Sequence, residues 1–87
     1  MTVIVELFGI PRSRAQTART EVEASCLAEA LAQLTLQFPA LGESCIDGDR
    51  LRDGLIANLN GDRFVSDPQT PLADGDALLI LSADAGG

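Results

Sequence analysis

The residues best suited to chemistry in this sequence are its last five, Ala83-Asp84-Ala85-Gly86-Gly87. Glycine lacks a Cβ, so a Gly-Gly end is the slimmest and most flexible peptide available and can enter a channel that excludes any side chain. The reactive group of such an end is its C-terminal carboxylate. At ordinary glycine usage two terminal glycines arise by chance in roughly 0.5% of chains. On the tail alone, a frayed terminus without a function is therefore as good an interpretation as a reactive end.

The rest of the sequence offers little chemistry. Histidine is absent, which removes the usual general base and the commonest metal ligand. The two cysteines, Cys26 and Cys45, are too few for a zinc site and too far apart for a CxxC motif, so we expect free thiols. Asp47 and Asp49 lack the spacing of an EF-hand loop, and we expect a solvated surface there. No metal site and no self-contained enzyme are predicted.

Charge and hydropathy restrict the partners. The net charge is −7, and the six basic residues are all arginines, which argues against a nucleic-acid partner and suits a basic protein. Without lysine, only the N-terminus offers an amine for attachment of another carboxyl terminus. Asp74, Asp76 and Asp84, close to the tail in sequence, are expected to steer it toward a basic groove. No stretch is long and apolar enough for a membrane span, and we expect a cytoplasmic protein.

The N-terminal half reads as two strands and a helix. Residues 2–8 are rich in β-branched residues and predict a strand, a turn follows through residue 15 with Arg12 and Arg14 exposed, and residues 16–23 predict a second, antiparallel strand. Ser25 is the expected N-cap of a helix that ends before Pro39. One apolar stripe marks the core side of this helix: Leu27, Leu31, Leu34 and Phe38.

The C-terminal half reads as a long connection, a hairpin and a last strand. Residues 40–54 predict an irregular, solvated segment. Asn60-Gly61 between residues 55–59 and 63–65 is a strong hairpin signal, because a type I′ turn needs positive φ at both central positions. The five apolar residues 77–81 predict a central strand that is covered on both faces. The order β, β, α, β, β, β indicates an α+β fold in which one helix covers one face of a small mixed sheet.

These pieces, in this order and spacing, resemble a ubiquitin-like β-grasp protein of the sulfur-carrier family that includes the small subunit of molybdopterin synthase and the thiamin-pathway carrier. The resemblance covers nearly the whole chain. It rests on the helix that runs into Phe38-Pro39-Ala40-Leu41, on Leu59-Asn60-Gly61, on Pro71-Leu72-Ala73-Asp74-Gly75-Asp76 and on Gly86-Gly87. It implies a β-grasp domain at residues 1–82 with about five strands and one main helix, and a flexible tail at residues 83–87.

The resemblance also implies a chemistry for Gly87. An adenylating activating enzyme would use ATP to convert its carboxylate into a mixed anhydride, and a sulfide equivalent would then displace AMP. The resulting thiocarboxylate would donate sulfur inside a second partner, while the carrier itself binds no cofactor. The length of the chain and of the connection at 40–54 favours the molybdopterin-synthase subunit, so this partner is expected to be the large subunit, in a heterotetramer.

Delivery of the tail requires a docking surface on the body. Ordering about four tail residues costs roughly 4 to 8 kcal/mol of backbone entropy, which corresponds to about 160 to 320 Å² of apolar burial. Gly86, Gly87 and Ala85 cannot contribute that area. The candidates on the body are Ile4, Phe8 and Phe64, if they lie on the sheet face that the helix leaves uncovered; the alternative for Phe8 and Phe64 is that they fill the core.

Three functional classes remain open on the sequence. The first is a sulfur carrier, with molybdopterin synthesis leading and thiamin, cysteine or secondary-metabolite synthesis behind it. The second is a ubiquitin-like modifier whose Gly87 forms an amide with a lysine of another protein. The third is a β-grasp interaction module with an inert tail. The first two use the same end of the chain, and only the third tolerates its loss.

Overall fold

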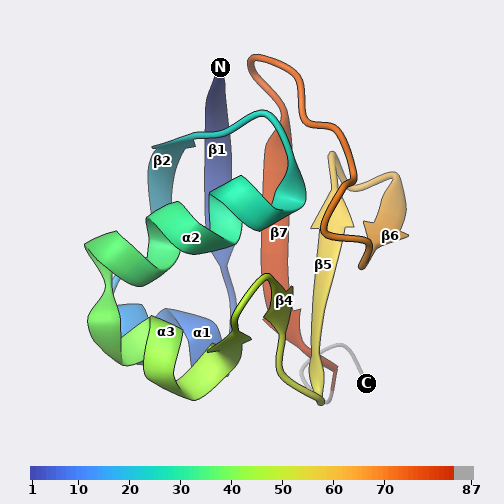
Figure 1. Ribbon diagram of the computed structural model, residues 1–87. Coiled ribbons are helices and arrows are strands. Elements are labelled where there is room, and N and C mark those ends of the chain that lie inside the picture. The colour runs from blue at the N-terminus through green and yellow to red at the C-terminus, as the bar shows by residue number, and fades with distance from the viewer. Residues whose placement is uncertain (84–87) are drawn as a thin grey trace.

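The computed structural model describes residues 1–83 and shows one mixed sheet with helices packed on it (Figure 1). The strand order is β2-β1-β7-β5-β6; β1 and β7 run parallel, and the other neighbours run antiparallel. This confirms the predicted α+β class and the five-stranded sheet. The five strands are β1 (Thr2–Leu7), β2 (Arg19–Glu23), β5 (Leu55–Leu59), β6 (Arg63–Val65) and β7 (Ala77–Ser82).

The predicted helix is α2 (Leu27–Gln37), and it packs across the sheet with the expected stripe. Leu27, Leu31 and Leu34 are at most 2% exposed, and Phe38 packs against the core from the end of the helix. Ser25 is not the N-cap as predicted: Cys26 holds that position. Ser25 instead donates from its backbone N–H and its Oγ to Glu29, at 2.7 and 2.8 Å. These bonds tie the chain down just before the helix begins.

Two further helices correct the expectation of a single one. The predicted turn after the first strand contains α1 (Ile10–Ala15), although Arg12 and Arg14 are exposed as expected. Pro39 does end α2, but it also begins α3 (Pro39–Cys45), because proline is well tolerated in the first turn of a helix, where its missing N–H has no partner to lose.

The predicted irregular connection is therefore wrong for most of its length. Helix α3 buries Leu41, Gly42 and Cys45, and the two-stranded ribbon of β3 (Ile46–Asp47) and β4 (Arg50–Leu51) follows it. Gly42 allows α3 to approach α2, since a Cβ at this glycine would lie 2.6 Å from Cγ2 of Thr35. The segment closes one side of the core.

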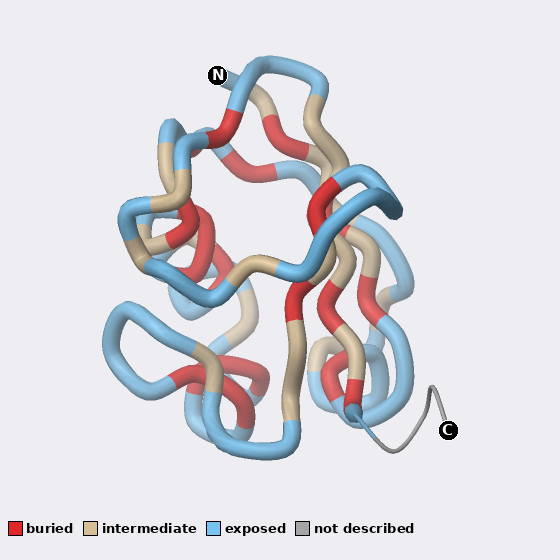
Figure 2. The backbone as a smooth tube through the Cα atoms, turned by 90° about the vertical axis from the view of Figure 1, so that its right-hand side faces the viewer, coloured by how far each residue is buried: buried red, intermediate tan, exposed pale blue. Residues whose placement is uncertain are grey.

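The hairpin and the central strand are confirmed. Asn60 and Gly61 have φ of 60° and 71°, and they connect β5 to β6. Strand β7 lies between β1 and β5 at the centre of the sheet. Its predicted cover on both faces is wrong: Leu78 and Ile80 are at most 1% exposed, whereas Leu79 and Leu81 are only half-buried. Strands β1 and β7 both alternate between buried and half-buried residues, which are coloured red and tan in Figure 2.

Among residues 1–83, no helix is long and apolar enough to cross a bilayer.

Candidate functional site: the open sheet face and the root of the tail

The side of the sheet opposite α2 is an open face, which we define by the strand residues that alternate with the core. In β1 these are Thr2, Ile4 and Glu6, which lie between the buried Val3, Val5 and Leu7. The register then aligns the other strands: Ile4 is opposite Ala77, Glu6 is opposite Leu79, Leu79 is opposite Asn58, and Asn58 is opposite Phe64. The open face thus runs through β1, β7, β5 and β6.

The three body residues that the sequence proposed for docking all lie on the open face. Ile4 is half-buried on the open face, and Phe64 is 68% exposed on the same face. Phe8 follows β1, and its N–H donates to the carbonyl of Ile80, which continues the ladder that Ile4 begins with Asp76. Alternation therefore directs Phe8 to the open face, where it is 39% exposed. All three lie outside the buried core cluster.

The sequence reasoning missed three apolar residues of the same face. Leu79 and Leu81 of β7 are half-buried there, and Ile56 of β5 is directly opposite Leu81. A run of five apolar residues indicates that both faces of a strand avoid water, but it does not say whether the second cover comes from the same chain or from a partner. Leu79 and Leu81 alternate with Leu78 and Ile80 along the strand, and this alternation is the sequence signal that places them on the opposite face.

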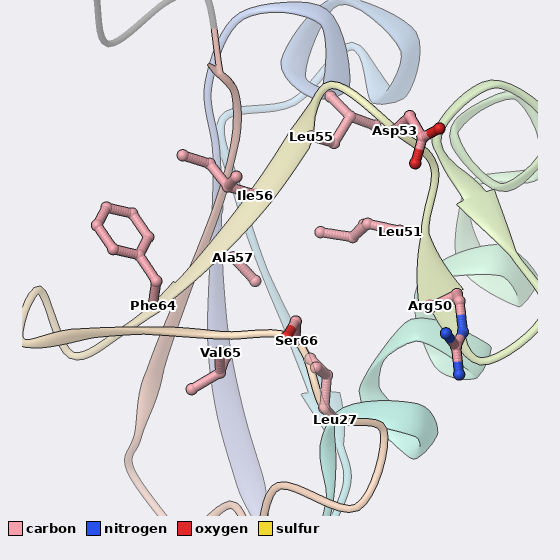
Figure 3. Close-up of a pocket in the computed structure, with 10 residues that line it drawn as sticks. All are labelled: Leu27, Arg50, Leu51, Asp53, Leu55, Ile56, Ala57, Phe64, Val65 and Ser66. Carbon is pink, nitrogen blue, oxygen red and sulfur yellow. The ribbon is translucent and has the colours of Figure 1, made fainter.

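A pocket of about 380 Å³ adjoins the open face at β5 and β6 (Figure 3). It lies where β6 stops at Val65 while β5 continues toward Leu55, so residues from both sides of β5 line it. Figure 3 shows Phe64 and Ile56 on one side of β5 and Leu51 and Leu55 on the other. The pocket widens the apolar surface beside Phe64, and Arg50 and Asp53 of its lining are polar.

The tail begins at one end of this face. Strand β7 ends at Ser82, and the N–H of Ala83 donates to the carbonyl of Gly54 at 2.8 Å. The buried Ser82 accepts from the N–H of Ile10 through its Oγ at 3.2 Å. These two bonds fasten the last described residues to α1 and to the chain before β5. The proposed site residues Ala85, Gly86 and Gly87, and also Asp84, lie outside the described residues.

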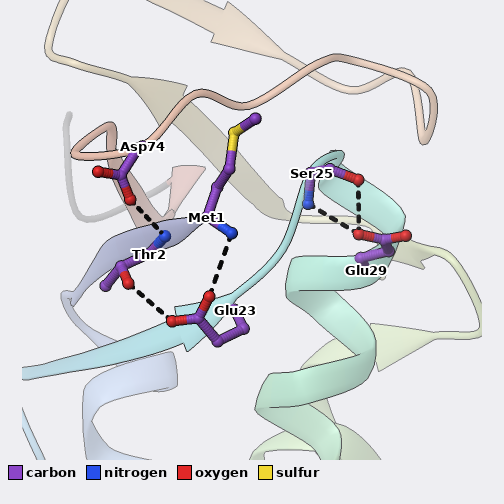
Figure 4. A network of polar contacts seen from close by, with 6 residues as sticks. All are labelled: Met1, Thr2, Glu23, Ser25, Glu29 and Asp74. Atoms are coloured by element: carbon purple, nitrogen blue, oxygen red, sulfur yellow. Dashed lines mark hydrogen bonds and ion pairs between the residues drawn. The ribbon is translucent and has the colours of Figure 1, made fainter.

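Two of the acidic residues assigned to the neighbourhood of the tail lie at the opposite end of the sheet. Asp74 accepts from the N–H of Thr2 at 2.8 Å (Figure 4), and Asp76 accepts from the N–H of Ala73 and from Asn60. Strand β7 carries the chain about 20 Å from this turn to Ala83, at roughly 3.3 Å per residue. The expectation that Asp74 and Asp76 lie near the tail is therefore wrong for its described residue, Ala83.

That opposite end is acidic and well ordered by hydrogen bonds. Glu23 accepts from Oγ1 of Thr2 at 2.7 Å and from the N-terminal ammonium of Met1 at 3.1 Å, and these contacts lower the pKa of Glu23 (Figure 4). Hydrogen bonds from the N–H of Ala73 and from Asn60 lower the pKa of Asp76 as well. These carboxylates accept hydrogen bonds that connect the N-terminus to β2 and to the turn before β7.

Other candidate chemistry is sparse in the described part of the chain. Within residues 1–83 no group of three or more metal-ligating side chains gathers. Cys26 and Cys45 are free thiols, as expected, and burial raises the pKa of Cys45, although Arg14 and Arg52 act in the opposite direction. Asp47 and Asp49 are exposed, as expected for a solvated surface. The described residues thus offer an apolar surface next to a tail, with no side-chain constellation for catalysis.

Comparison with known proteins gives a consistent result. A family model described as the ThiS family matches residues 5–87. No curated protein matches the sequence. The solved structures that the fold resembles include small archaeal modifier protein 1 from Haloferax volcanii, which is 23% identical with a TM-score of 0.84 and 100% coverage of both chains. This similarity confirms the β-grasp fold.

Two other similar structures are complexes. One is the BexX/CysO complex of Amycolatopsis orientalis, with 22% identity, a TM-score of 0.81, and coverage of 98% of this chain and 99% of the other. The second is the complex of subunits 1 and 2 of the molybdopterin-converting factor from Helicobacter pylori, with 26% identity, a TM-score of 0.65, and coverage of 94% and 93%. Both neighbours are small proteins that were solved with a partner.

Proposed function

We propose that Gly87 carries the sulfur in this chain, which belongs to the ThiS family of ubiquitin-like sulfur carriers. A carboxylate is a poor electrophile, so a partner enzyme first transfers AMP from ATP to Gly87 and releases pyrophosphate. A sulfide equivalent then attacks the carbonyl carbon of this anhydride, and the C–O bond to AMP breaks. The product is a thiocarboxylate, which donates its sulfur in the active site of a second partner.

One observation supports this proposal above the others: the open face and the tail share β7. Leu79 and Leu81 lie on the open face, and the same strand ends at Ser82, directly before the tail. A protein that covers the open face therefore lies at a fixed distance from Ala83, the first residue of the tail. Docking of the body positions Gly87 without any catalytic group on the carrier.

The exposed area is adequate for this task. Phe64 is 68% and Phe8 39% exposed, and with about 200 Å² for a phenylalanine the two residues present about 210 Å². That lies within the roughly 160 to 320 Å² needed to offset the ordering of four tail residues. Ile4, Phe8 and Phe64 are accordingly the proposed partner-binding residues of the body, with Ala85, Gly86 and Gly87 those of the tail. Leu79, Leu81 and Ile56 extend this surface.

For the pathway, we propose the small subunit of molybdopterin synthase, which would join the large subunit in a heterotetramer. The similarity to the molybdopterin-converting-factor complex from Helicobacter pylori supports this choice, since it is among the more identical of the structural neighbours. The BexX/CysO complex supports the alternative of cysteine or secondary-metabolite synthesis, and thiamin synthesis is a further alternative. The location that fits these partners is the cytoplasm.

A ubiquitin-like modifier is the second candidate, and the similarity to small archaeal modifier protein 1 favours it. Both functions begin with adenylation of Gly87, and they differ in the acceptor. A sulfur carrier returns to a free carboxylate after transfer, whereas a modifier ends in an amide with a lysine of another protein. Amide-linked adducts in cell extracts therefore separate the two candidates.

The experiment that tests the proposal is reconstitution with the adenylating enzyme of the same host, ATP and sulfide. Pyrophosphate exchange into ATP measures the first step, and alkylation of the product followed by mass spectrometry measures the thiocarboxylate. We expect both signals with the full chain and with Leu36→Ala, a control that changes an exposed residue of α2 and retains the Gly-Gly end. We expect neither after deletion of Gly87. Equal exchange with the deleted chain would refute the assignment of Gly87.

A further inference from the structure

The open face carries an asparagine among its apolar residues. Asn58 lies on β5 between the buried Ala57 and Leu59, so its side chain points to the open face. The strand register places Leu79 of β7 on one side of it and Phe64 of β6 on the other. Directly opposed residues of neighbouring strands have Cβ atoms about 5 Å apart. The Asn58 amide therefore lies between two apolar side chains.

The amide of Asn58 has no hydrogen-bond partner in the described part of the chain. Its Oδ1 is buried and unpaired, and no bond from its Nδ2 is found within residues 1–83. Glu6 shares the same cross-strand row, but β7 separates its strand from β5, and two strand spacings of about 10 Å exceed the reach of an asparagine. Because Asn58 is only half-buried, its Nδ2 reaches the surface of the open face while its Oδ1 points inward.

The neighbouring Asn60 shows how the chain normally uses such a side chain. Its Oδ1 accepts from the N–H of Ala77 at 2.8 Å, and its Nδ2 donates to Asp76 at 3.1 Å. Most buried polar atoms in folded proteins are paired in this way, because an unpaired one destabilises the fold. A leucine in place of Asn58 would avoid that cost and would match the apolar neighbours. The unpaired amide of Asn58 is therefore explained better by a contact outside the chain than by the fold itself.

We propose that Asn58 is a specificity-determining residue of the open face, and that its Nδ2 donates a hydrogen bond to a main-chain carbonyl of the protein that covers this face. The inference rests on the proposed function, in which a partner docks on the open face. It adds a polar requirement to a surface that is otherwise apolar around Leu79 and Phe64. The partner must present a peptide group opposite Asn58.

The chemistry of the exposed Nδ2 selects the group that it binds. Nδ2 is a donor, so lysine and arginine, which carry donors only, cannot accept from it. A carboxylate is disfavoured, because Glu6, Glu21 and Glu23 lie on the same side of the sheet and Arg19 balances only part of their charge. A backbone segment that covers an apolar surface loses water from its own peptide groups, which then need partners. A main-chain carbonyl therefore fits Asn58 best.

The consequence for binding is discrimination between partner surfaces. Apolar burial alone is non-directional, so the open face without a polar group would accept any apolar surface of suitable shape. A purely apolar surface placed on Asn58 removes water from Nδ2 and leaves it unpaired, which is unfavourable. A surface with a carbonyl at that point avoids the penalty. Asn58 thus fixes the position of the partner on the face.

The test is calorimetric titration of the adenylating enzyme of the same host with the full chain, Asn58→Leu and Asn58→Asp. We expect Asn58→Leu to raise Tm by about 4 to 8 °C, since it removes the unpaired amide, and to raise Kd about 10- to 100-fold, since it leaves the partner carbonyl unpaired. Asn58→Asp, which replaces the donor by an acceptor, should also raise Kd. Gln33→Leu is the matched control, because Gln33 is half-buried on α2, on the helix side of the sheet; its Kd should equal that of the full chain.

Each other outcome overturns the inference. If Asn58→Leu binds as tightly as the full chain or more tightly, the amide has no role in the interface; if its Tm falls, the amide serves the fold. Tighter binding by Asn58→Asp would mean that the partner presents a cation or an N–H. A dimer of the full chain in sedimentation that Asn58→Leu dissociates would make a second copy the occupant. Pyrophosphate exchange is measured separately, so binding without exchange would refute the proposed function while the comparison at Asn58 still decides the inference.

Discussion

Removal of the Phe64 ring should weaken partner binding far more than it weakens the fold. Phe64 is 68% exposed, so the ring contributes little to the core, and Phe64→Ala should change the free energy of unfolding by less than about 1 kcal/mol. A phenylalanine presents roughly 200 Å². Burial of the exposed part by a partner contributes at most about 3.5 kcal/mol at 25 cal/mol per Å².

Alanine retains its Cβ, so the expected loss of binding free energy is about 2 to 3 kcal/mol, or roughly 30- to 150-fold in Kd. Leu36→Ala is the matched control, because Leu36 is 75% exposed on α2 and thus lies on the helix side of the sheet. Titration calorimetry with the adenylating enzyme measures both affinities, and thermal unfolding measures both stabilities. The reasoning is refuted if the two variants bind equally well.

Three further predictions concern the fold. Gly42→Ala should lower the free energy of unfolding by about 1 to 3 kcal/mol in urea denaturation, because its Cβ would lie 2.6 Å from Cγ2 of Thr35. Thr35→Ser in the same chain removes that methyl group and should recover part of the loss, and no recovery would contradict the clash. Asn60→Ala should cost about 1 to 2 kcal/mol, since Asn60 has φ 60° and bonds to Ala77 and Asp76; Asn60→Gly should cost less, and equal losses would remove the backbone strain from the explanation. The hydrogen bond from the Ala73 N–H, with that from Asn60, lowers the pKa of Asp76 below its unfolded value. The contribution of the Asp76 carboxylate to stability is therefore complete above about pH 5 and is lost as the pH falls through the lowered pKa. Asp76→Asn should melt at a lower temperature than the full chain at neutral pH and approach it in acid, and a constant difference in Tm would show that titration of Asp76 is not involved.

Local signals predicted the parts of the fold that local physics determines. Asn60-Gly61 specifies its turn because both residues adopt positive φ, and the hairpin follows from that alone. The spacing of Leu27, Leu31 and Leu34 identifies the core side of α2 for a similar reason, since the helical period places them on one face. Neither prediction needs knowledge of distant residues.

The segment after α2 was mispredicted because its signals have two meanings. Pro39 ends one helix and begins the next, and Gly42 is a loop residue in most sequences but here permits the contact with Thr35. Leu41 and Cys45 have helical spacing, but a helix of about two turns is too short to show a period clearly. Only packing against α2 and α1 reveals that this segment belongs to the core.

The sequence identified some residues of the open face but not its full extent. Ile4, Phe8 and Phe64 do lie together on the open face, whereas Leu79 and Leu81 were assigned to a doubly covered strand. The charges near the tail were misjudged because proximity in sequence is not proximity in space: β7 separates Asp74 and Asp76 from Ala83.

Top-down mass spectrometry of the chain isolated from its native host, with sulfur metabolism active, tests the central claim most directly. The account predicts that sulfur replaces one oxygen of the carboxylate of Gly87. Fragmentation must locate the change, because oxidation of Met1 gives nearly the same mass difference at the other end of the chain. A uniformly unmodified Gly87, or one found only in amide-linked adducts, would contradict the account.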